Sequence, residues 1–74
     1  MNQPDEILIN SDFIKLDQFL KWATVVNSGI EAKFLIEAGK VLVNEEIEQR
    51  RGRKLFPGDR VQVSNQVFLL TQAK

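Results

Sequence analysis

The chain contains neither cysteine nor histidine among its 74 residues, and this absence limits what can stabilise its fold. Disulfide bonds are impossible and most zinc sites are excluded, so a domain of this size depends on one small hydrophobic core. The Ser-His and Cys-His pairs of nucleophilic enzymes are missing as well. We therefore expect a single domain over residues 1–74 that is not an enzyme, with no catalytic residues, no metal and no cofactor.

No segment has the pattern of a targeting signal or of a membrane span. Residues 1–6 are acidic and polar, unlike the basic start and apolar run of a secretory signal. The longest apolar runs, such as residues 67–70, are far shorter than the roughly 20 residues that cross a bilayer. Together with the lack of cysteine, these features predict a cytoplasmic protein with no membrane partner.

Two helical patterns follow each other closely in the first half of the chain. Apolar residues recur at helical spacing over residues 16–26 and predict a first helix that ends near Asn27. Ser28 and Glu31 fit a capping box, so a second helix is expected to begin there. Gly39 is suited to the left-handed conformation that ends this second helix. The apolar stripes are Leu16, Phe19, Leu20 and Ala23 on the first helix and Ala32, Leu35 and Ile36 on the second.

The remaining segments favour strands and tight turns. Residues 7–9 predict a short strand. Residues 41–43 and 46–48 flank Asn44-Glu45, which predicts a β-hairpin although the second turn position lacks glycine. Pro57-Gly58 predicts a type II turn, and residues 60–64 and 67–71 predict two further strands joined near Asn65-Gln66. The expected class is α+β, with two antiparallel helices packed on a small, mainly antiparallel sheet of about four to five short strands.

The basic segment, Arg50-Arg51-Gly52-Arg53-Lys54, holds four of the ten Lys and Arg residues of a chain whose net charge is zero. The planar guanidinium of arginine matches the geometry of phosphate. A nucleic acid responds to charges within about 10 Å, so a neutral total does not exclude a basic binding face. The alternative is a solvated loop whose cations pair with Glu45, Glu46 or Glu48. Taken alone, the basic segment supports both interpretations about equally.

Three lysines outside this segment are candidates for the same surface. Lys15, Lys33 and Lys40 would converge with the basic segment if the two helices pack antiparallel beside the hairpin. Ser28 is interpreted as a helix cap and not as a nucleophile. The three glutamates are not expected to form an acid–base pair or a cation site, because adjacent carboxylates on a hairpin point to opposite faces and neither burial nor a partner is evident.

Most of the aromatic side chains are expected to pack in the core. Trp22 is the best candidate for stacking on a nucleic-acid base, because it lies beside the apolar stripe of the first helix and not within it. The six aromatic residues are Phe13, Phe19, Trp22, Phe34, Phe56 and Phe68.

Taken in order, these blocks resemble the RNA-binding domain named after protein S-four of the small ribosomal subunit, also called the αL motif. The resemblance covers residues 14–61, and its blocks are residues 15–20, 28–36, 39–45 and 57–61. The short chain and its basic segment look most like the small bacterial YaaA-type members.

The resemblance implies a module that binds structured RNA, commonly ribosomal or transfer RNA, in association with the ribosome and without a small-molecule substrate. The RNA-contacting positions that it implies are Lys15, Ser28, Lys33, Lys40, Arg50, Arg51, Arg53 and Lys54. The family often has arginine at the position of Lys15 and two basic residues around position 33, so the basic segment is expected to carry a larger share of binding here. The remaining alternative is a protein-interaction module that uses the basic segment to bind an acidic partner.

Overall fold

The computed structural model describes residues 3–72, which contain two helices and seven strands. The elements are β1 (Asp5–Ile9), β2 (Ile14–Lys15), α1 (Leu16–Trp22), α2 (Gly29–Glu37), β3 (Val41–Val43), β4 (Glu46–Ile47), β5 (Lys54–Leu55), β6 (Arg60–Val63) and β7 (Gln66–Gln72). Five strands form a sheet in the order β1-β7-β6-β3-β4, and β2 and β5 form a separate two-stranded ribbon. Every strand pair is antiparallel except β1 with β7. The predicted α+β class is confirmed.

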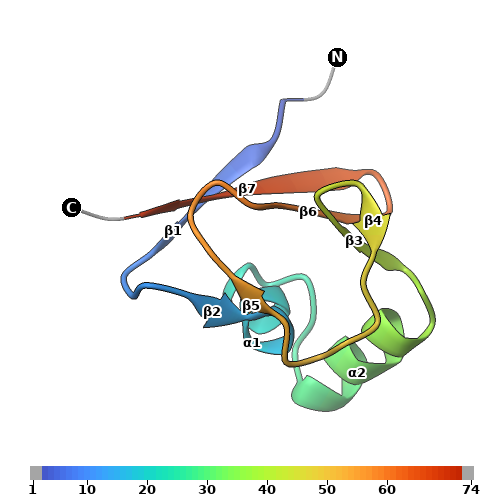
Figure 1. Ribbon diagram of the computed structural model, residues 1–74. Coiled ribbons are helices and arrows are strands. Elements are labelled where there is room, and N and C mark those ends of the chain that lie inside the picture. The colour runs from blue at the N-terminus through green and yellow to red at the C-terminus, as the bar shows by residue number, and fades with distance from the viewer. Residues whose placement is uncertain (1–2, 73–74) are drawn as a thin grey trace.

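The hydrophobic core lies between the five-stranded sheet and the two helices, which pack below it in Figure 1. Side chains of β3, β6 and β7 alternate between buried and more exposed positions, as expected for a sheet with one face against the core. Phe19 of α1 meets Phe68 of β7 edge to face, with ring centroids 5.9 Å apart. The buried apolar residues are Ile9, Leu16, Phe19, Leu20, Val26, Ala32, Ile36, Val41, Val43, Leu55, Val61, Val63, Phe68 and Leu70.

The first helix is shorter than predicted, because it ends at Trp22 and not near Asn27. Thr24 has a φ of 58°, a left-handed conformation that stops the helix, and the amides of Val25 and Val26 both donate to the carbonyl of Leu20. This turn brings Val26 into the core, where it is buried. Val26 is therefore buried by the turn after α1, and helical spacing alone did not predict that α1 ends before this turn.

The second helix has the limits that its local signals predicted. The Ser28 side chain accepts a hydrogen bond from the Glu31 amide at 3.2 Å, and the helix begins at Gly29. Gly39 has a φ of 75°, so the expected left-handed residue lies just beyond the helix. Ala32 and Ile36 are buried, which confirms the apolar stripe.

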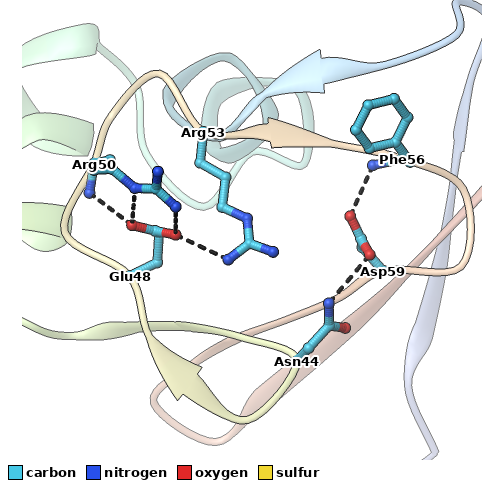
Figure 2. Close-up of polar contacts among 6 residues, drawn as sticks. All are labelled: Asn44, Glu48, Arg50, Arg53, Phe56 and Asp59. Atoms are coloured by element: carbon cyan, nitrogen blue, oxygen red, sulfur yellow. Dashed lines mark hydrogen bonds and ion pairs between the residues drawn. The ribbon is translucent and has the colours of Figure 1, made fainter.

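Two turns brace each other at the β3–β4 end of the sheet. Asn44 and Glu45 have φ angles of 51° and 73°, as a type I′ hairpin requires. The Asn44 side-chain amide donates to Asp59 Oδ1 at 3.1 Å, while Asp59 Oδ2 accepts from the Phe56 amide at 2.8 Å (Figure 2). Gly58, with a φ of 98°, occupies the position of positive φ in the predicted Pro-Gly turn.

Two details of the strands differ from expectation. The β6–β7 hairpin turns at Ser64 and Asn65, one residue earlier than predicted, and Ser64 has a φ of 55°. The β2–β5 ribbon was not predicted, because two residues per strand are too few to show alternation. Neither helix in residues 3–72 is long and apolar enough to cross a membrane.

Glu45→Gly is expected to stabilise the protein. A residue with a side chain at a φ of 73° is strained by about 1 kcal/mol, and glycine removes that strain although it adds freedom to the unfolded chain. We expect a gain of about 0.5 kcal/mol, seen as a rise of a few degrees in the melting temperature by circular dichroism. Glu46→Gly, one residue later in β4, is the control and should lower the melting temperature, because glycine weakens a strand. Equal effects of the two changes would contradict this account.

Candidate nucleic-acid interface

The backbone of the basic segment caps the N-terminus of α1. The Leu16 amide donates to the Arg53 carbonyl at 2.9 Å, and the Asp17 amide donates to the Arg51 carbonyl at 3.1 Å. Lys15, the residue before the helix, is extended and offers no side-chain cap. The basic segment therefore supplies the acceptors that the first turn of a helix needs. Its backbone is fixed against α1, while the side chains of Arg51 and Lys54 are exposed.

Glu48 holds two of the four cations of the basic segment. Its Oε2 accepts from Arg50 Nε at 3.0 Å and from the Arg50 amide at 3.1 Å. Its Oε1 accepts from Arg50 Nη2 at 3.0 Å and from Arg53 Nη1 at 2.9 Å (Figure 2). Glu48 is only 6% exposed, whereas the Arg50 side chain is 75% exposed. The carboxylate therefore lies beneath the arginines and orients them.

The arginines keep Glu48 ionised. Hydrogen bonds from the Arg50 side chain, with those from Arg53 and the Arg50 amide, lower the pKa of Glu48 to about 2, although burial acts in the opposite direction. The same contact raises the pKa of Arg50. At neutral pH the cluster is therefore fully charged, with two cations sharing one anion.

The sequence did not indicate that a glutamate of this region is buried, but Glu48 is buried and pairs with Arg50 and Arg53. Glu48 lies just after β4, so the alternation of side chains along the hairpin strands does not determine which way its side chain points. The amide of Glu48 donates to the Val41 carbonyl at 3.0 Å, which keeps this part of the chain close to the core. The spacing of Glu48, Arg50 and Arg53 could have indicated the cluster. Glu45 and Glu46 are exposed.

Arg51 and Lys54 differ from the two arginines that bind Glu48. Within residues 3–72, neither side chain forms an ion pair. The interpretation of the basic segment as a paired, solvated loop therefore describes Arg50 and Arg53, and it does not describe Arg51 and Lys54.

Lys15 lies beside the basic segment, immediately before the first residue of α1. It belongs to β2, where it pairs directly across the ribbon with Lys54. The Lys54 ammonium is also 4.8 Å from the centre of the Phe13 ring. The structure thus brings Lys15 together with the basic segment at the start of α1.

The other predicted positions lie at α2 and not at the β2–β5 ribbon. Ser28 caps α2, and Lys33 and Lys40 are exposed on and just after that helix. The described residues show no hydrogen bond or ion pair from either lysine to the basic segment. One contact does link the two regions, since Gln49 Nε2 donates to the Glu37 carbonyl at 3.0 Å. This bond ties the start of the basic segment to the C-terminal end of α2.

The prediction that most aromatic residues lie in the core was wrong. Phe19 and Phe68 are buried, whereas the other four are exposed. Phe34 lies two residues from both Ala32 and Ile36, so it points away from the buried face of α2. Trp22 is exposed, as its place beside the stripe suggested, and its Nε1–H donates to the Leu8 carbonyl at 2.9 Å. The exposed four are Phe13, Trp22, Phe34 and Phe56.

The candidate site is therefore an open surface. No pocket is present in the part of the chain that the structure describes, and no cluster of acidic residues there could hold a metal ion. The surface combines exposed cations with a backbone held by α1, Glu48 and Gln49. The backbone of such a surface does not have to be ordered when an extended anion binds.

Comparison with known proteins reveals two similarities. The family model described as "S4 domain" matches residues 7–71. The chain is also 49% identical over 57 residues to the "Probable ribosome maturation protein RlbA" of Bacillus subtilis (strain 168). That alignment covers 77% of this chain and 80% of the relative.

Glu48→Gln is expected to destabilise the protein at neutral pH by about 1–3 kcal/mol, because two arginines lose their ionised acceptor. The pKa of Glu48 is lowered in the folded state, so its contribution to stability is present above about pH 4.5 and lost as pH falls towards 2. Urea unfolding of both proteins between pH 7 and 3 would measure this. The difference in unfolding free energy should shrink as the pH falls.

Glu46→Gln is the matched control, since Glu46 is exposed and forms no ion pair in the described residues. Its effect on unfolding should be small across the same pH range. A difference between wild type and Glu48→Gln that stayed constant down to pH 3 would show that the carboxylate charge does not stabilise the fold.

Proposed function

Because the chain belongs to the S4 domain family, we propose that it is a non-catalytic module that binds structured RNA through the basic segment and its surroundings. The observation that carries this proposal is the docking of the basic segment on the first turn of α1. The carbonyls of Arg51 and Arg53 face the helix, so their peptide positions are fixed. Arg51, Lys54 and Lys15 then present exposed cations from a defined backbone.

The charge of this surface favours a polyanion. Glu48 is the acidic partner of Arg50 and Arg53 in the described residues, so the four cations of the basic segment outnumber it by three. The Arg50 guanidinium uses Nε and Nη2, and the Arg53 guanidinium uses Nη1, to bind the carboxylate. Each guanidinium has five N–H donors and therefore keeps donors for a phosphate. The two arginines can bind RNA while they remain on Glu48.

The residues on α2 form the outer part of the proposed surface. Lys33 and Lys40 are exposed, and Lys40 follows the helix end to which Gln49 is bonded. They would extend phosphate contacts from the basic segment along the RNA backbone. Ser28 already accepts a bond from Glu31, so its hydroxyl hydrogen is the part left for RNA.

We assign ribosomal RNA as the target, in the cytoplasm and during ribosome maturation. The support is the name of the Bacillus subtilis relative, "Probable ribosome maturation protein RlbA", and the extent of the similarity to it. Transfer RNA is the competing target, and direct comparison of the two RNAs distinguishes them.

The double variant Arg51→Gln/Lys54→Gln tests the surface. Affinity for purified bacterial ribosomal RNA should be measured by filter binding over a series of salt concentrations. Each phosphate contact contributes about 0.7–0.9 to the slope of log affinity against log salt, so the variant should flatten the slope by about 1.4–1.8. Neither side chain bonds to Glu48, so the melting temperature should stay close to that of wild type.

Lys21→Gln is the matched control, because Lys21 is an exposed lysine in the last turn of α1 and lies outside the proposed surface. It should leave the slope unchanged. An unaltered slope in the double variant would place RNA binding elsewhere on the protein. Binding of an acidic protein partner that persists after ribonuclease treatment, with no affinity for RNA, would support the protein-interaction alternative.

The target assignment predicts that the protein co-sediments with ribosomal particles in cell lysate. Because the proposed contacts are electrostatic, raising the salt concentration should release it, and the Arg51→Gln/Lys54→Gln variant should be released at lower salt. Sucrose-gradient fractionation with immunodetection measures both effects. Sedimentation only at the top of the gradient, together with tighter binding to transfer RNA, would contradict the ribosomal assignment.

A further inference from the structure

The β2–β5 ribbon has two different faces. Ile14 pairs with Leu55, and Lys15 pairs with Lys54. Successive side chains of a strand point to opposite faces, so the first pair lies on one face and the second pair on the other. Leu55 is fully buried and Ile14 packs against the core. The face that carries Lys15 and Lys54 therefore points away from the core.

Two aromatic residues continue this outer face. Phe13 precedes β2 and Phe56 follows β5, so each is two residues from the lysine of its own strand. Their ring centroids are 6.1 Å apart. Phe13 is 37% exposed and Phe56 is 48% exposed, and the Lys54 ammonium lies over the Phe13 ring. We call these four residues, Phe13, Lys15, Lys54 and Phe56, the aromatic–lysine platform.

Two features of the platform are unfavourable in the protein alone. Two lysines directly across an antiparallel pair repel each other. Two phenylalanine rings that remain partly in water lose part of the stabilisation that burial provides. A ligand with an anionic group and a flat apolar group would remove both costs at once. A nucleotide has both groups in one unit.

The backbone of the platform is held in place. The Phe56 amide donates to Asp59 Oδ2 at 2.8 Å, and the Phe13 carbonyl accepts from Ser11 Oγ at 2.8 Å. The ribbon itself leads directly into α1, whose first amide is bonded to the Arg53 carbonyl. The rings and ammonium groups are therefore presented together, next to the basic segment.

We propose that the aromatic–lysine platform binds an unpaired nucleotide of the RNA, with the base stacked on Phe13 and Phe56 and its phosphate between Lys15 and Lys54. This inference rests on the proposed function and adds to it a preference for an unstacked base beside a helical region. A paired base has both of its flat faces covered by neighbours, whereas a bulged or looped base exposes one to an aromatic side chain. Binding to the charged phosphates of the RNA backbone alone would show no preference for an unpaired base.

The test compares two RNA hairpins that differ by one unpaired uridine in the stem. Wild-type protein should bind the bulged hairpin more tightly than the fully paired one. Phe13→Leu/Phe56→Leu should weaken binding to the bulged hairpin by about 5- to 150-fold, since stacking of one base contributes roughly 1–3 kcal/mol. Affinity for the paired hairpin and the salt slope should change little, because the lysines remain.

Phe34→Leu is the matched control, because it makes the same change at an exposed phenylalanine on α2. It should leave the preference for the bulged hairpin intact, and thermal unfolding should confirm that all variants fold. A second measurement uses wild-type protein alone. Photo-crosslinking of 4-thiouridine at the bulge should attach to peptides that contain Phe13 or Phe56.

Equal affinity of wild type for the two hairpins, or crosslinks that avoid both phenylalanines, would overturn the platform and leave the proposed RNA binding standing. Equal loss of affinity for both hairpins in Phe13→Leu/Phe56→Leu would also overturn it, because the rings would then act through the structure of the ribbon. Failure of wild type to bind these hairpins and ribosomal RNA would overturn the proposed function together with the platform.

Discussion

The hydrogen bonds between the first turn of α1 and the basic segment join two parts of the chain that are far apart in sequence. Leu16 and Asp17 donate to the carbonyls of Arg53 and Arg51, in place of the side-chain cap that Lys15 does not provide. The ribbon continues this junction, since β2 leads into α1 and β5 begins at Lys54, the last residue of the basic segment. Stability and binding therefore depend on the same peptide groups. The cations cannot be repositioned without uncovering the helix end.

Glu48 shows how a negative charge can serve a positive surface. It lowers the net charge of the region, but three hydrogen bonds to its carboxylate fix the directions of the Arg50 and Arg53 side chains. Without it, two flexible side chains would have to be ordered when RNA binds, which costs free energy. Since the carboxylate is buried and both arginines retain free donors, orientation is obtained without blocking the outer side of the guanidinium groups.

The sequence correctly predicted the helix ends and turns that depend on residues close together in the chain. Ser28 and Gly39 mark the limits of α2, and Asn44-Glu45 forms the expected hairpin turn even without glycine. Features set by distant contacts were missed. The early end of α1 accompanies burial of Val26, and the β2–β5 ribbon exists because the chain returns to α1. For the candidate site, composition located the basic segment, but only the fold showed that Glu48 divides its cations into two kinds.

The parallel pairing of β1 with β7 has a consequence for folding during translation. Asp5 is aligned with Phe68 and Ile9 with Gln72, so the first strand of the described residues pairs, among these residues, only with the last. The helices and the β3–β4 hairpin involve near neighbours and can form early, whereas this long-range closure carries the larger entropy cost. During translation β1, whose Ile9 is buried in the finished domain, remains without its strand partner until β7 has left the exit tunnel. Completion of the sheet therefore waits for β7, the last strand of the described residues to be synthesised.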